Sequence, residues 1–214
     1  MTLKATILGA IAAAALALAP AAQAGVVSSS GGIVYYVGSQ GERNDVLVTV
    51  DSLLGIPVYS ITDNDAIPIS LGAGAGPACE LVNAVGMCRT AGINSLFIDT
   101  RDRDDTITIA DAGVFGGVPV GARMIGGRGV DVLLGGNGGD ILKGGNGRDS
   151  LRGRKGADGY RSGRGSDTLQ TLDGAADAWI SCGPGYRDLL RADKPDPPSK
   201  NCELGKFAKR SKRK

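Results

Sequence analysis

Residues 126–170 read, in order, GGRGVDVLL, GGNGGDILK, GGNGRDSLR, GRKGADGYR and SGRGSDTLQ. Set out in this register, the segment repeats every nine residues, with an aspartate at the sixth position and a large side chain at the eighth. The aspartates are Asp131, Asp140, Asp149, Asp158 and Asp167, and the large side chains are Leu133, Leu142, Leu151, Tyr160 and Leu169. A fixed period of this kind predicts stacked repeats, each of which is supported by its neighbours.

Each nine-residue unit divides into a six-residue turn and a three-residue strand. Glycines at positions one, two and four permit a tight turn with positive φ. The aspartate at position six offers the hard anionic oxygen that calcium prefers, and backbone carbonyls can complete an oxygen shell. Because side chains alternate along a strand, position eight points inward while positions seven and nine face outward. We therefore expect the five large side chains to form a thin apolar spine.

This pattern resembles the RTX (haemolysin-type) nonapeptide repeat, G-G-x-G-x-D-x-U-x. The resemblance implies a parallel β-roll, in which one coil takes two repeats and Ca²⁺ ions lie between turns stacked on the same edge. Repeats two apart would then share ions, pairing Asp131 with Asp149, Asp140 with Asp158, and Asp149 with Asp167. The predicted metal ligands are Asp131, Asp140, Asp149, Asp158, Asp167, Gly126, Gly135, Gly144, Asn137 and Asn146.

The last two repeats depart from the pattern. Arg154 replaces the glycine of position two, and Ser162 replaces the glycine of position one. Asn137 and Asn146 at position three can offer a side-chain oxygen, whereas the other repeats carry a basic residue there. The segment holds eight basic residues against five aspartates, so we expect weak calcium binding, best at Asp131 and Asp149.

Residues 1–24 have the features of a signal peptide. Lys4 precedes an apolar run from Ile7 to Ala19, Pro20 interrupts it, and residues 22–24 read Ala-Gln-Ala. The run is shorter than the roughly 20 residues of a membrane-spanning helix. The sequence therefore predicts a secreted protein that begins at Gly25, with no membrane span; an uncleaved helix is the alternative.

Residues 25–120 predict an irregular β region. Short segments rich in β-branched and aromatic residues lie between turn clusters, at 33–37, 46–50, 67–71, 96–98 and 106–109. The segment 99–107 keeps the Asp-x-Ile step of the repeat but lacks its glycines. It is either a decayed repeat or a solvated turn, and the solvated turn is favoured because glycine-free sequences suit positive φ poorly.

Residues 121–179 form the predicted repeat unit, with 126–170 as its core. A capping segment, 180–205, and a disordered basic tail, 206–214, follow. Trp179 is expected to cover the open end of the spine, and the prolines at 195, 197 and 198 are expected to mark the end of order. The stretch Cys182-Gly183-Pro184-Gly185 resembles the ending of small secreted bacterial calcium-binding proteins of this type.

Four cysteines in an exported chain predict two disulfides, with three possible pairings. Local pairing, Cys79 with Cys88 and Cys182 with Cys202, is favoured because neither loop then crosses the repeats. A zinc site is disfavoured because the cysteine spacings do not fit one and the chain has no histidine. The predicted fold is all-β: a parallel β-roll behind an irregular β region, closed by a short disulfide-bonded cap.

These features predict a secreted, non-enzymatic calcium-binding protein, expected to be monomeric. The alternative is a cell-surface module that binds anionic polymers through Lys143, Arg152, Arg161 and the basic tail, with calcium as a structural ion. Specific nucleic-acid binding is not expected, since no aromatic residues interleave with the basic ones. An enzyme is the least favoured class, because residues 25–120 show no nucleophile motif and no acid–base pair.

Overall fold

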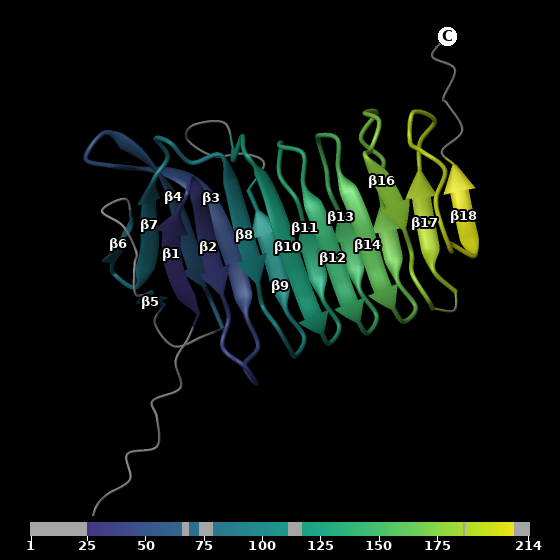
Figure 1. The fold of residues 1–214 in the computed structure, drawn as a ribbon, viewed down its shortest axis with the longest axis horizontal. Helices are drawn as coiled ribbons and strands as arrows, with labels where there is room; N and C mark the ends of the chain where they lie inside the picture. Colours follow the sequence, from purple (N-terminus) through teal and green to yellow (C-terminus); the bar gives the residue numbers. More distant parts are fainter. Residues whose placement is uncertain (1–24, 66–68, 73–78, 111–116, 186, 208–214) are drawn as a thin grey trace, which may run out of the picture.

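The nine-residue period determines how the strands are arranged. The computed structural model describes residues 25–65, 69–72, 79–110, 117–185 and 187–207. Within these residues the strands form two facing sheets, and no helix occurs (Figure 1). In the repeats, successive strands alternate between the two sheets, so residues 18 apart become neighbours in the same sheet.

Sheet A lies along the length of the molecule (Figure 1). Its strands, in spatial order, are β5 (Ser70–Leu71), β1 (Val26–Ser30), β2 (Ile33–Val37), β8 (Ser95–Asp99), β10 (Gly121–Arg128), β12 (Ile141–Asn146), β14 (Gly159–Arg164) and β16 (Trp179–Ser181).

Sheet B faces sheet A and carries the remaining strands. In spatial order they are β6 (Cys79–Val82), β7 (Val85–Arg89), β4 (Ile56–Asp63), β3 (Asp45–Leu53), β9 (Thr106–Ile109), β11 (Val132–Leu134), β13 (Ser150–Arg152), β15 (Thr168–Gln170), β17 (Leu189–Ala192) and β18 (Leu204–Phe207).

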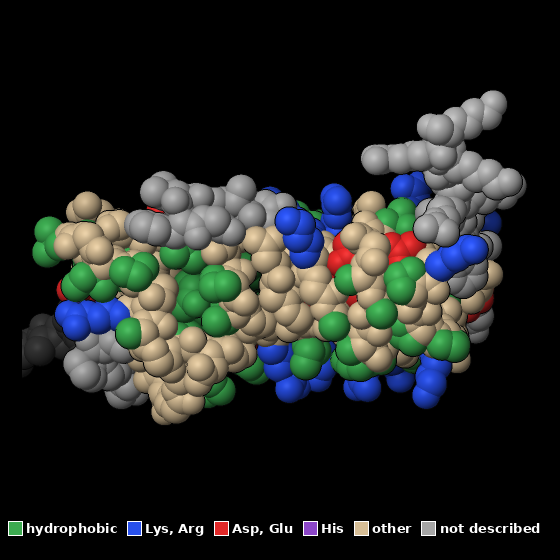
Figure 2. Space-filling model, turned by 90° about the horizontal axis from the view of Figure 1, so that it is seen from above, with side chains coloured by type: hydrophobic (Ala, Val, Ile, Leu, Met, Phe, Trp, Pro, Cys, Tyr) green, Lys and Arg blue, Asp and Glu red, His purple; other side chains and the backbone are tan. Residues whose placement is uncertain are grey.

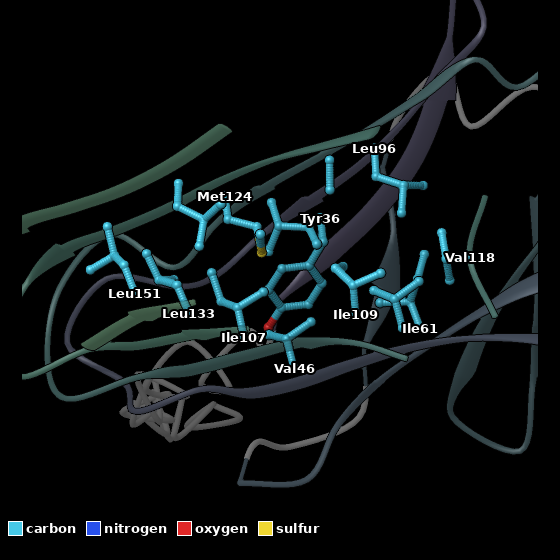
Figure 3. Close-up of a cluster of buried hydrophobic side chains, with 14 of the residues drawn as sticks. Tyr36, Val46, Ile61, Leu96, Ile107, Ile109, Val118, Met124, Leu133 and Leu151 are labelled. Atoms are coloured by element: carbon cyan, nitrogen blue, oxygen red, sulfur yellow. The ribbon is translucent and has the colours of Figure 1, made fainter. Parts of the chain in front are cut away.

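The core is a narrow column of inward side chains between the sheets. In sheet A, Met124, Leu142 and Tyr160 are aligned by parallel pairing, and in sheet B the aligned residues are Leu133, Leu151 and Leu169. All six are at most 1% exposed, which confirms the predicted spine. Figure 3 shows the column continuing into the preceding region, where Tyr36 lies beside Val46 and Ile107.

The region before the repeats belongs to the same two sheets. Strands β2 and β8 pair in parallel with each other, β8 pairs with β10, and β3, β9 and β11 are joined in the same way in sheet B. The predicted strands at 33–37, 46–50, 96–98 and 106–109 are confirmed; of the one at 67–71, only residues 69–71 are described. Antiparallel pairs, β1 with β2 and β4 with β3 and β7, close this end.

The interpretation of residues 99–107 as a solvated turn is wrong. Arg101 and Arg103 adopt φ of 71° and 81° without being glycine, and the turn that they form stacks on the first repeat. Asp105 is 1% exposed, and Ile107 lies in the core opposite Leu133. The segment is therefore a further level of the stack.

The stack also continues past residue 179, so the predicted role of Trp179 is wrong. Ile180, not Trp179, pairs with Tyr160 and fills the core, while the Arg161 guanidinium lies 5.8 Å from the centre of the Trp179 ring. Beyond the three prolines, β18 pairs with β17 and includes residues 206 and 207 of the predicted tail. Residues 208–214 lie outside the described residues.

Both disulfides follow the favoured local pairing. Cys79 and Cys88 lie opposite each other on β6 and β7, with a Cα–Cα distance of 4.0 Å. Cys182 and Cys202 join the turn after β16 to the segment before β18, with a Cα–Cα distance of 5.2 Å. In the part of the chain that the structure describes, no helix is long and apolar enough to cross a membrane.

Replacing Leu151 by alanine should lower the free energy of unfolding by about 2–5 kcal/mol, because the cavity would form in a core one side chain wide. Denaturant unfolding measures the change. Val130 is 50% exposed in the same repeat segment, and its replacement by alanine serves as the control. Equal effects of the two substitutions would contradict the proposed spine.

Candidate metal sites

The aspartates of the repeats lie in turns along the two long edges of the stack (Figure 1). We call edge 1 the row of turns leading from a strand of sheet A to the next strand of sheet B: 38–44, 100–105, 126–131, 144–149, 162–167 and 182–188. Edge 2 is the opposite row of turns, 135–140, 153–158 and 171–177. Turns on one edge belong to repeats two apart, as the RTX resemblance implied.

Edge 1 contains a continuous chain of hydrogen bonds between successive turns. In each level the backbone N–H of the sixth-position residue donates to Oδ1 of the aspartate in the next level, over 2.8–3.0 Å. The donors are Asn44, Asp105, Asp131, Asp149 and Asp167, and the acceptors are, in the same order, Asp105, Asp131, Asp149, Asp167 and Asp188. The Asp188 N–H in turn donates to Oε2 of Glu203, at 2.9 Å.

The second carboxylate oxygen of these aspartates is buried without a hydrogen-bond donor. This holds, among the described residues, for Oδ2 of Asp105, Asp131, Asp149, Asp167 and Asp188. The Ser162 hydroxyl lies beside Asp167 but donates to the Cys182 carbonyl, at 2.7 Å. Buried polar atoms are nearly always satisfied by protein or solvent, so a row of five such oxygens is suited to bind a cation.

The glycines of edge 1 make room for the carboxylates and for the stacking of turns. A Cβ at Gly144 would lie 2.3 Å from Oδ2 of Asp149, and one at Gly126 would lie equally close to Oδ2 of Asp131. Gly145 and Gly147 have φ of 129° and 146°, and a Cβ on either would lie within 2.0 Å of a carbonyl oxygen in the turn before. Backbone carbonyls and carboxylates are thus brought together where turns meet.

Such a site must use backbone oxygens, because no group of three or more acidic or thiol side chains is placed to hold a metal in the described part of the chain. Each turn contributes one carboxylate, and the stacked carbonyls are hard neutral donors of the kind that calcium accepts. The residues therefore fit an oxygen-liganded cation.

Burial dominates the electrostatics of edge 1. It raises the pKa of Asp131 to about 7, with the charges of Asp149 and Asp105 adding to the effect. It raises the pKa of Asp105 and Asp149 to about 6, and it also raises the pKa of Asp167 and Asp188. A bound cation would favour the charged forms.

Two carboxylates of this row were missed by the sequence interpretation. Asp105 was discounted because its turn carries arginines in place of glycines. Asp188 was missed because the segment from Cys182 to Leu190 is a repeat with one extra residue, so that Asp188 comes six residues after Cys182 instead of five. Both have an aspartate followed two residues later by a large apolar residue. At Asp105 this step was recognised but outweighed by the missing glycines, and at Asp188 it could have identified the residue.

Edge 2 differs from edge 1 although its first turn, 135–140, keeps the glycines of the motif. None of those glycines has positive φ. Both oxygens of Asp140 accept backbone N–H groups, Oδ1 from Ala122 at 2.7 Å and Oδ2 from Gly136 at 2.8 Å. Asp158 accepts from the Asp140 N–H through Oδ1 and from the Tyr160 hydroxyl through Oδ2.

The other predicted ligands are divided between the edges. Gly126 and Gly144 lie on edge 1, and Gly135 lies on edge 2, where its carbonyl accepts a hydrogen bond from Arg154. Asn137 is half-buried on edge 2. Asn146 is exposed on edge 1, and its carbonyl accepts from the Gly129 N–H at 2.9 Å.

When a chelator keeps the protein free of calcium, raising the pH from 5 to 8 should lower the free energy of unfolding. The pKa of Asp131 is raised to about 7 in the folded protein, so the fold holds a proton that the unfolded chain releases near pH 4. This stabilisation is complete below pH 4 and is lost as the pH rises through about 7. Denaturant unfolding at each pH checks this, and Asp131→Asn should flatten the dependence. A steeper dependence in the variant would contradict the assignment.

Comparison with protein families agrees with the geometry. Residues 123–142 and 134–169 match the model of the RTX calcium-binding nonapeptide repeat (4 copies). Neither a curated protein nor a solved structure matches the chain. Repeats of this family bind Ca²⁺, and the matched residues hold Asp131, Asp149 and Asp167 of edge 1. Residues 123–169 of this chain are therefore RTX-type calcium-binding repeats.

Proposed function

We propose that this chain is a secreted protein whose two sheets form a β-roll that Ca²⁺ folds or stiffens, and that it acts without catalysing a reaction. The observation that carries the proposal is the row of buried Oδ2 atoms along edge 1 that lack a donor. A cation would neutralise carboxylates that are costly to bury as anions. Calcium binding would then be coupled to folding, because the unfolded chain has no such row.

The ligands that we propose are those of edge 1. Asp131, Asp149 and Asp167 would supply carboxylate oxygens, and the turns that begin at Gly126 and Gly144 would supply carbonyls. Asp105 and Asp188 have the same burial and the same unsatisfied oxygen, so the row of sites extends beyond the residues that match the family.

Binding should be weak, with a Kd of about 10⁻⁴–10⁻³ M, as in extracellular calcium modules. The eight basic residues of 126–170 oppose a divalent cation. At about 1 mM calcium, each site would add roughly 0.4–1.4 kcal/mol to the free energy of unfolding. Several such sites together can decide whether the stack is folded.

Secretion is supported by two features. Two disulfides indicate a non-reducing environment. The features of a signal peptide at 1–24, which lie outside the described residues, agree with export. The repeat itself is a structural calcium-binding element, which favours a role that does not involve catalysis.

Replacing Asp149 by alanine should remove more than one bound calcium ion, because Asp149 lies between two proposed sites. Isothermal titration of calcium into residues 25–214 measures the number of ions, with Asp51→Ala, on β3 away from the turns, as the control. Asp149→Asn removes the negative charge but keeps an oxygen that can accept the hydrogen bond from the Asp131 N–H. Comparing it with Asp149→Ala therefore separates the effect of the lost charge from the effect of the lost hydrogen bond. Loss of one ion or none would refute the sharing of ligands; no binding by the parent protein would refute the function.

A second candidate, binding of an anionic polymer, is favoured by one observation on the outer face of sheet A. The pKa of Lys143 is lowered, first by its partial burial and then by the positive charges of Arg123 and Arg161. The three basic side chains therefore lie close together on this face. Figure 2 shows basic side chains along one long margin of the molecule. Arg152, which the sequence grouped with them, lies in β13 of the other sheet.

If this face binds a polyanion, Arg123→Ala with Arg161→Ala should weaken retention on an immobilised polyuronate, whereas Arg152→Ala should not. The retention should also fall steeply as salt increases, because the attraction is electrostatic. Elution at increasing salt measures both effects. Equal effects of the variants on the two sheets would point to non-specific attraction.

A further inference from the structure

Arg154 occupies an unusual backbone position. It stands at the second position of the fourth repeat, where the edge 1 turns have Gly127, Gly145 and Gly163, and it has φ of 73°. A non-glycine residue in this region is strained by about 1 kcal/mol or more, so its contacts must compensate.

Those contacts join turn 153–158 to turn 135–140 and to the end of β9. The side chain is carried by turn 153–158, and its Nη1 donates to the carbonyl of Gly135, at 3.1 Å, and to the carbonyl of Ile109, at 2.8 Å. The guanidinium cation therefore already bridges the carbonyls of Ile109, at the end of β9, and of Gly135, a residue predicted to bind calcium. The guanidinium charge also acts on Asp140, where it lowers the pKa against the larger effect of burial.

The neighbouring carboxylates need no further partner. Both oxygens of Asp140 accept backbone N–H groups, and both oxygens of Asp158 accept hydrogen bonds, the second from Tyr160. The same tyrosine hydroxyl accepts from the Gly153 N–H, at 2.9 Å. On edge 1, by contrast, each of the five aspartates leaves one oxygen without a donor.

We infer that Arg154 is a built-in cation that replaces a calcium ion on edge 2, at the level of turns 135–140 and 153–158. The inference rests on the proposed function, since it assumes that calcium fills edge 1. Calcium then binds along edge 1, and turns 135–140 and 153–158 of edge 2 keep their structure in the absence of the ion. Arg154 thus reduces the number of calcium ions that the protein binds by one.

The test is to restore the glycine of the motif. Arg154→Gly removes the guanidinium and relieves the positive φ, and it should bind one more calcium ion per chain than the parent protein in isothermal titration. Its melting temperature should fall in a chelator and recover when calcium is added. Lys155→Gln removes an exposed charge of the same turn and should leave both readouts unchanged.

A second substitution locates the added ion. Asp140→Asn should leave the number of ions unchanged in the parent protein, but in the Arg154→Gly background it should remove the ion that was gained. If Arg154→Gly binds the same number of ions as a calcium-binding parent, the inference is overturned while the proposed function stands. If the parent binds none, the proposed function fails; an ion gained by Arg154→Gly would still support the role of Arg154.

Discussion

The hydrogen bond from the amide of one turn to the aspartate carboxylate of the next is the interaction on which the stack depends. Along edge 1 it recurs from Asn44 to Asp188 with nearly constant length. It joins successive levels of the stack in the turns between strands, where no sheet hydrogen bonds are formed by the paired strands. It also explains the first glycine of the motif, because the carboxylate of Asp149 lies where the Cβ of residue 144 would be.

The same hydrogen bond creates an electrostatic problem, because it uses one carboxylate oxygen and buries the other. The two edges meet this problem in different ways. On edge 1 the second oxygen has no donor among the described residues, which suits a cation from solution. In turns 135–140 and 153–158 of edge 2 the protein supplies the partners itself, the N–H of Gly136 for Asp140 and the hydroxyl of Tyr160 for Asp158. In turn 171–177, Oδ2 of Asp173 and of Asp177 has no donor among the described residues. One sequence motif thus serves two kinds of turn.

The period of the repeats predicted much of this structure. The nine-residue spacing, together with the two-repeat coil that the RTX resemblance implies, placed Leu133 and Leu151 in register and put Asp131 beside Asp149, because parallel pairing carries an 18-residue offset directly into space. The limits of the stack could not be predicted in this way. Arg101 and Arg103 hold positive φ because the neighbouring turn fits closely against them, and this tertiary effect outweighs their local preference. The difference between the edges was also hidden, since turn 135–140 has the intact motif and a different backbone.

The hydrogen bonds from the sixth-position amides of edge 1 all run in one direction. Each of these amides is satisfied by a residue that comes later in the chain, so the hydrogen bond of one turn forms only when the following turn on this edge has folded. The last amide of the row, that of Asp188, is satisfied by Glu203, the residue after Cys202, and the disulfide to Cys182 holds this end near its turn. The Cys182–Cys202 disulfide therefore keeps Glu203 near the last turn of the row in the described part of the chain, where Glu203 takes the place of a following aspartate.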